Sequence, residues 1–184
     1  MKGPAAACKA PQDYRTEVAA VLAELGIPAD YGPRRRLEVC EEAAELESIG
    51  ADVLGREQKL MPAAAKAWRA LCAAAAEDGV QLQVVSAFRS FDYQRALIQR
   101  KLDNGKRIAD ILKVNAAPGY SEHHTGRALD ITTPDCPPLE QGFETTRAFA
   151  WLTKHAAEHG FRLSYPRDNP HGISYEPWHW AYTG

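Results

Sequence analysis

The strongest constraint on the fold comes from two polar segments that lie far apart in the chain. The first, SEHHTGRALD, covers residues 121–130, and the second, YEPWHW, covers residues 175–180. Each holds an imidazole and a carboxylate, and Asp130 stands directly between a leucine and an isoleucine. An unpaired carboxylate is costly in apolar surroundings, so it needs partners. We therefore expect the two segments to fold against each other.

Three side chains from these segments form a ligand set for a metal ion. His123 and Asp130 are seven residues apart, and His179 follows in the second segment. Two histidines and one aspartate are sufficient for a catalytic zinc that keeps its fourth position open to water. Glu176, three residues before His179, is then available as a general base beside that water. The pattern predicts a zinc hydrolase.

These residues also have purely structural interpretations. Asp130 is explained equally well as a buried carboxylate that backbone amides or a neighbouring arginine satisfy. His124 is a rival to His123 as a ligand. His155 and His159 share one face of an expected helix and could chelate, but no third ligand is near them in the sequence. We interpret that pair as solvated.

The second segment needs a local irregularity to bring both of its polar groups to the metal. Strand alternation sends His179 to the face opposite its two tryptophan neighbours, and Glu176 would point to the wrong face in an ideal strand. Pro177 removes a ladder donor and is common at strand edges and bulges. We expect a bulge at Pro177 that returns Glu176 to the metal side.

Composition limits the classes of partner. The chain has 184 residues, 45% hydrophobic and 25% charged, which suits one soluble globular domain. A net charge of -2 provides no basic field, so we expect neither nucleic acid nor anionic membrane as a partner. No apolar run approaches the roughly 20 residues of a membrane span, and the N-terminus lacks the apolar core of a signal peptide. The four cysteines show no CxxC spacing.

Periodicity predicts an α+β fold, with helices packed on a small, mainly antiparallel sheet. The pattern shows no regular βαβ alternation. The expected helices cover residues 13–25, 37–48, 62–78, 91–103, 108–114 and 145–159, with Ser90 as an N-cap. The expected strands cover residues 80–85, 127–132, 161–165 and 173–182.

The motifs together resemble the VanY-type zinc D-alanyl-D-alanine carboxypeptidases. The wider group includes D,D-dipeptidases, L,D-carboxypeptidases, phage L-alanyl-D-glutamate endolysins and the Hedgehog domain. The pattern S-x-H-x-x-G-x-A-x-D at 121–130, the EPWH run at 176–179 and the upstream SAFRS at 86–90 carry the resemblance. It implies a Hedgehog/D,D-peptidase-like fold. We expect a zinc peptidase domain at residues 56–184 and a helical extension at residues 1–55, packed on that domain as one globular unit.

The resemblance also implies a role for each site residue. It makes His123, Asp130 and His179 the zinc ligands and Glu176 the catalytic base, and position in the motif favours the first of the two adjacent histidines. Arg89 is then expected to support the substrate carbonyl or carboxylate, with a structural salt bridge as the alternative. Ser121 and Gln94 match positions that contact the terminal carboxylate of the substrate.

The expected activity is hydrolysis of the D-Ala-D-Ala bond at the C-terminus of peptidoglycan stem peptides. The alternatives are an L,D-carboxypeptidase, a phage-type L-alanyl-D-glutamate endolysin, and a zinc-stabilised binding module like the Hedgehog domain. The expected partners are stem peptides or muropeptides, and we expect a monomer. The substrate implies the cell envelope, although no signal peptide is visible in the chain; a cytoplasmic location is the alternative.

Overall fold

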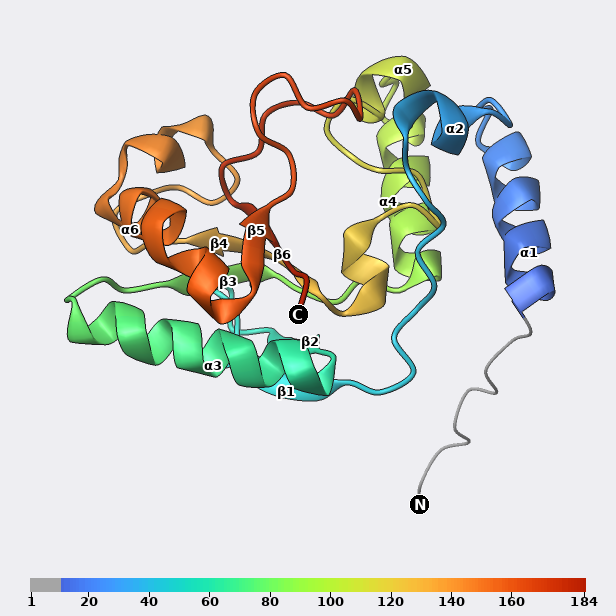
Figure 1. Ribbon diagram of the computed structural model, residues 1–184. Helices are drawn as coiled ribbons and strands as arrows, with labels where there is room; N and C mark the ends of the chain where they lie inside the picture. The colour runs from blue at the N-terminus through green and yellow to red at the C-terminus, as the bar shows by residue number, and fades with distance from the viewer. Residues whose placement is uncertain (1–10) are drawn as a thin grey trace.

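The computed structural model describes residues 11–184 and shows helices arranged around a small sheet (Figure 1). The described residues form six α-helices, which are α1 (Pro11–Glu24), α2 (Tyr31–Arg35), α3 (Pro62–Glu77), α4 (Phe91–Asp103), α5 (Ile108–Ile111) and α6 (Arg147–His155). The strands are β1 (Glu47–Ala51), β2 (Glu57–Leu60), β3 (Gln83–Ser86), β4 (Ala128–Thr132), β5 (Phe161–Leu163) and β6 (His179–Tyr182). Short 3₁₀ helices are η1 (Glu122–Thr125), η2 (Gln141–Thr145) and η3 (Ala156–His159). The α+β prediction is confirmed.

The four-stranded sheet brings the two polar segments together. Its strand order is β3-β4-β6-β5, and every neighbouring pair is antiparallel. In this register Asp130 of β4 lies opposite His179 of β6 on one side and Ser86 of β3 on the other. Pairing of β4 with β6 therefore places a carboxylate beside an imidazole that is 49 residues away in the chain.

Two hydrophobic clusters support the sheet and the site from different sides. The first joins the sheet to α3 and α6, and it includes Trp68, Leu129 and Trp180, all of them buried. The second joins α1 to α4 and α5 through residues such as Val18 and Ile98. Figure 1 shows α3 and α6 near the sheet, with α1 and α4 on the other side of the molecule. Among residues 11–184, no helix has both the length and the apolar character that crossing a membrane requires.

The predicted helix at residues 37–48 is wrong. Residues 36–46 are irregular, and residues 47–51 form β1, which pairs with β2 in a hairpin that the sequence did not predict. The backbone of this segment bonds to a distant loop and not to itself. The N–H of Cys40 donates to the carbonyl of Gly119 at 2.7 Å, and that of Ala43 donates to the carbonyl of His124 at 2.9 Å. Tertiary hydrogen bonds thus replace the helical ones.

Expected elements near the C-terminus are shorter than predicted, and two of them differ most, since β5 loses only the last two of its expected residues. The helix expected over residues 145–159 is divided into the end of η2, the α-helix α6 and the 3₁₀ turn η3. The strand expected over residues 173–182 begins only at His179, because Pro177 and Trp178 form a turn. The N–H of His179 donates to the carbonyl of Glu176 at 3.1 Å and closes that turn.

Candidate metal centre

Three side chains meet at one end of the β4–β6 pair. His123 comes from η1, Asp130 from the middle of β4, and His179 is the first residue of β6. One potential ligand atom from each side chain lies within 4.8 Å of the other two, and all three residues are buried. The structure thus brings together the three side chains that the sequence predicted as ligands.

His123 is oriented so that one ring nitrogen is left without a partner. Its Nδ1 lies 2.6 Å from the carbonyl oxygen of Ala87, which can only accept, so Nδ1 carries the proton. The bare Nε2 faces Oδ2 of Asp130 at 3.4 Å and has no hydrogen-bond partner. Burial lowers the pKa of His123 to about 4, so the ring stays neutral at pH 7. A buried lone pair facing a carboxylate is stabilised by a cation between them.

His179 is held by carboxylates at both ring nitrogens. Its Nδ1 lies 3.1 Å from Oδ1 of Asp130, and its Nε2 lies 2.9 Å from Oε2 of Glu122. Burial disfavours a charged ring, but the bonds to these carboxylates outweigh it and raise the pKa of His179 to about 10. A metal at Nδ1 would replace the proton there and leave Nε2–H bonded to Glu122. Such a carboxylate behind a ligating histidine fixes the tautomer and the ring orientation.

The donor set fits zinc. Two imidazole nitrogens and one carboxylate oxygen are common ligands of catalytic zinc, and a fourth position would stay open. In the described part of the chain, three buried side-chain atoms have no hydrogen-bond partner, and they are Nε2 of His123, Nε of Arg89 and Oγ of Ser164. Two of the three belong to predicted site residues. Unpartnered buried polar atoms are rare in folded proteins, so their presence here indicates a site that fits an ion.

Glu176 reaches the metal side through a turn and not through the predicted bulge. The turn at Pro177 and Trp178 brings Oε2 of Glu176 to 4.0 Å from Nδ1 of His179. The carboxyl group is buried, and burial, together with the charge of Asp130, raises the pKa of Glu176 to about 7. A carboxyl group that is ionised about half the time near pH 7 can both accept and donate a proton.

Arg89 lies on the loop after β3, and the structure shows the salt bridge that was the alternative to its predicted contact with the substrate. Its Nη2 forms an ion pair with Oδ2 of Asp130 at 3.4 Å, which is the structural alternative. Its Nη1 donates to Oε1 of Gln94 at 3.4 Å, while its buried Nε has no partner. The Arg89 side chain is still 17% exposed, so a guanidinium that anchors the site can also contact a ligand through its accessible atoms.

The other two predicted substrate residues are both buried. Gln94 donates from Nε2 to the carbonyl of Ala116 at 2.8 Å and accepts from Arg89, so both ends of its amide are already bonded within the protein. This geometry favours a role in orienting Arg89. Ser121 immediately precedes η1, two residues before His123. Direct substrate contacts by Gln94 and Ser121 stay predictions.

The rival ligand His124 is fully occupied by the backbone. Its Nδ1 lies 2.6 Å from the carbonyl oxygen of Arg89, and its Nε2 accepts from the N–H of Gly119 at 3.1 Å. His124 thus links η1 to the loop at Arg89 and to the loop at Gly119, and it offers no free nitrogen to a metal. Of the other two candidate histidines, His155 stacks on Trp151 with ring centroids 4.8 Å apart, and neither it nor His159 belongs to the three-residue cluster.

Sequence reasoning missed Glu122. This side chain accepts from His179 and forms an ion pair through Oε1 with Arg162 at 2.9 Å. The only signal was its place beside His123, because the residue it orients is 57 positions away in the chain.

Comparison with known proteins places these features in one family. A family model described as VanY, D-alanyl-D-alanine carboxypeptidase, matches residues 57–184. The putative carboxypeptidase YodJ of Bacillus subtilis (strain 168) is 32% identical over 183 residues, which cover 94% of this chain and 62% of YodJ. The chain therefore spans less than two thirds of that relative.

Solved structures agree with this result. The LdcB LD-carboxypeptidase matches with a TM-score of 0.70 and 30% identity, over 78% of this chain and 70% of LdcB. A mutant of the vancomycin resistance D,D-pentapeptidase VanY in complex with Zn(II) matches with a TM-score of 0.59 and 28% identity, over 86% of this chain and 83% of the other. Since the family model matches more than half of the sequence, the chain belongs to the VanY family of D-alanyl-D-alanine carboxypeptidases.

Proposed function

We propose that this protein is a zinc-dependent carboxypeptidase that hydrolyses the D-Ala-D-Ala bond at the C-terminus of peptidoglycan stem peptides. The observation that carries the proposal is the bare Nε2 of His123 facing Asp130, with His179 and the carboxyl group of Glu176 close by. This arrangement provides a place for a cation and a base next to it. The zinc-bound VanY relative supports zinc as that cation.

The protein side chains would divide the reaction between proton transfer and charge stabilisation. Zinc held by the three ligands would polarise the peptide carbonyl and acidify a water molecule. Glu176 would take a proton from that water as its oxygen attacks the carbonyl carbon, and would deliver a proton to the amide nitrogen as the C–N bond breaks. The guanidinium of Arg89 would donate to the carbonyl oxygen, where negative charge develops. The products are free D-Ala and a peptide shorter by one residue.

A second candidate is an L,D-carboxypeptidase, which would remove the last D-Ala from a tetrapeptide stem. The higher TM-score to LdcB, 0.70 against 0.59 for the zinc-bound VanY mutant, favours keeping it. Both activities need the same metal and base, so they differ in the peptide that the cleft accepts. In either case the substrate would place the enzyme in the cell envelope.

Mass spectrometry of muropeptides incubated with the protein, with and without a chelator, tests the proposal. Loss of one alanine from pentapeptides, abolished by the chelator and restored by zinc, is the expected result. Loss of alanine from tetrapeptides alone would identify the L,D-carboxypeptidase, and cleavage inside the stem would identify an endopeptidase. A zinc-loaded protein that changes no muropeptide would contradict every enzymatic reading and favour a binding module.

A further inference from the structure

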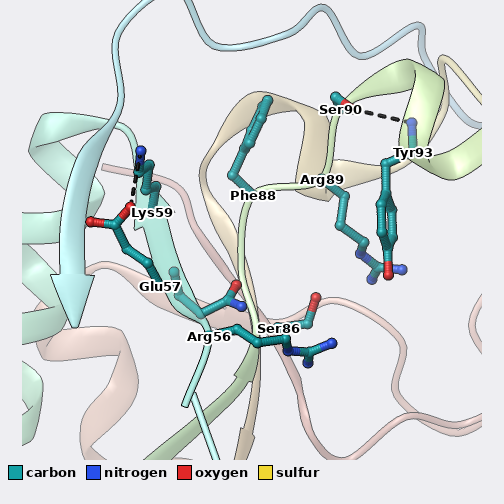
Figure 2. A pocket seen from close by; sticks show the side chains of 9 residues that line it. Arg56, Glu57, Lys59, Ser86, Phe88, Arg89, Ser90 and Tyr93 are labelled. Carbon is teal, nitrogen blue, oxygen red and sulfur yellow. Dashed lines mark hydrogen bonds and ion pairs between the residues drawn. The ribbon is translucent and has the colours of Figure 1, made fainter. Parts of the chain in front are cut away.

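A cavity beside Arg89 has no role in the reaction described above. Its volume is about 360 Å³, which is much larger than one alanine side chain needs. Residues 56–59, which belong to β2 and the residue before it, form one wall, and the end of β3, the following loop and the start of α4 form the other (Figure 2). The residues that line it and bear on the argument are Arg56, Ser86, Phe88, Arg89 and Tyr93.

Arg56 is anchored at this cavity by a buried carboxylate. The side chain of Asp52 is fully buried, and its two oxygens accept four hydrogen bonds. The donors are the N–H groups of Leu54 and Arg56, the Nε of Arg56 at 2.7 Å and the side-chain amide of Gln58 at 2.9 Å. Because Nε is the atom engaged, the two terminal nitrogens of Arg56 are left toward solvent, and the side chain is 56% exposed.

The two arginines belong to one surface. Figure 2 shows the guanidinium groups of Arg56 and Arg89 on the same side of the loop that follows β3, with Ser86 drawn between them. The remaining charged residues of the wall, Glu57 and Lys59, form an ion pair with each other at 3.2 Å and add no net charge. The donors facing the cavity are therefore mainly those of two guanidinium groups. The terminal nitrogens of Arg56 form the open planar fork that suits a carboxylate, because both terminal nitrogens of Arg89 already bond to Gln94 and Asp130.

The hairpin is also attached directly to the metal site. Oε1 of Gln58 accepts from the N–H of Ala87 at 2.9 Å, and the carbonyl of Ala87 accepts from His123 at 2.6 Å. Asp52, which holds Arg56, also holds Gln58. Arg56 thus has a fixed position relative to the reaction centre.

We propose that Arg56, together with Arg89, forms a subsite for a second carboxylate of the peptide, carried by a residue before the cleaved bond. This inference rests on the proposed carboxypeptidase function and names its substrate class, a peptide with an acidic acyl portion. The departing residue of a carboxypeptidase is a single alanine, so a cavity of this size beside Arg89 is available for the longer acyl side.

The test compares two stem pentapeptides that differ only in one group. In one peptide the α-carboxylate of the glutamyl residue is free, and in the other it is an amide. The wild-type protein should favour the free acid by about three- to tenfold in kcat/KM, as expected for a partly exposed charged contact. Arg56→Gln should abolish this preference. The variant should keep its fold, because the backbone N–H that Asp52 also binds is retained.

Arg69→Gln is the matched control. Arg69 also forms an ion pair at 2.7 Å with an acidic residue of the hairpin, Glu47, and its side chain is 49% exposed, but it does not line the cavity. Its variant should keep the wild-type preference. A preference that survives Arg56→Gln, or that is absent from the wild type, would overturn the subsite.

Failure of the subsite and failure of the proposed function give different results. If the wild type releases D-Ala from both peptides at equal rates, the carboxypeptidase function stands and the subsite is wrong. If it releases D-Ala from neither, the proposed function is wrong, and calorimetric binding of the same two peptides decides the subsite. Tighter binding of the acid that Arg56→Gln removes would support it, and equal binding would refute it.

Discussion

Replacement of Glu122 by alanine should weaken zinc binding although Glu122 is not a ligand. The carboxylate accepts from Nε2 of His179 at 2.9 Å, and the His179 side chain is only 3% exposed. In Glu122→Ala the ring loses the group that fixes its rotation and its tautomer. The Nδ1 lone pair is then aimed at the metal for only part of the time.

The expected magnitude follows from two opposing effects. A buried donor left without its partner costs about 1–3 kcal/mol, which corresponds to about 5- to 150-fold in affinity. Loss of the carboxylate also has the opposite effect, because it lowers the affinity of His179 for the proton that competes with zinc. The hydrogen bond to Glu122 raises the pKa of that ring, and the variant lacks it. Water can also approach the vacated position, since the Glu122 side chain is 23% exposed. We therefore expect about a tenfold loss of affinity.

Competition with a chromophoric chelator at constant pH measures the zinc affinity without relying on turnover. Glu122→Gln should recover most of the loss, because its amide oxygen can still accept from Nε2. Arg162→Gln is the control. It removes the other partner of Glu122, at 2.9 Å and 53% exposed, and should change the affinity less than threefold. A folded Glu122→Ala protein that binds zinc as tightly as the wild type would refute the positioning role.

Four further predictions use other parts of the site and its support. Glu176→Ala should keep one zinc per chain by elemental analysis and lose about 10²–10⁴-fold in kcat. His124→Ala should also keep the zinc but lower the free energy of unfolding by about 2–4 kcal/mol in urea titrations, since the substitution leaves buried backbone groups unpaired. Loss of zinc from this variant would instead identify His124 as a ligand. Gly126→Ala should lower the free energy of unfolding by ~2–4 kcal/mol, because φ is +64° and the added Cβ would lie 2.8 Å from a backbone nitrogen. Stability equal to that of the wild type would contradict this prediction. Burial alone would raise the pKa of Asp52, but its hydrogen bonds lower that pKa below 3.8. The difference in unfolding free energy between the wild type and Asp52→Asn should therefore shrink as the pH falls below 3.8. A difference that does not change with pH would contradict this prediction.

The parts of the fold that could be predicted are those whose pattern is local. Ser90 was expected to cap α4, and its side chain accepts from the N–H of Tyr93. The helix at residues 62–77 was recognisable from one apolar stripe. Residues 37–48 were misjudged because Cys40 and Ala43 bond to loops about 80 residues further along the chain. No pattern within a segment can report partners that distant.

The hairpin was missed for a different reason. The residues of β1 and β2 are mostly exposed and polar, so neither strand shows the alternation that marks a half-buried strand. Its turn is held by hydrogen bonds to the buried carboxylate of Asp52 and not by a hydrophobic contact. In the site, likewise, residue types and spacing were sufficient to choose three candidate ligands that the fold brings together. The orientation of each ring depends on the carbonyl of Ala87 and the carboxylate of Glu122, and neither hydrogen bond can be read from the motifs that contain these residues.

The region that matches the family model and the folded unit begin at different residues. The match starts at residue 57, yet α1 contributes Val18 and Leu22 to the cluster that covers α4. The irregular segment after α2 binds the backbone of the loop that holds His123, through the carbonyl groups of Gly119 and His124. The ligand loop is therefore held on one side by the sheet and on the other by residues before the matched region. In physical terms, residues 11–56, which carry no recognisable motif, help to hold the candidate metal centre.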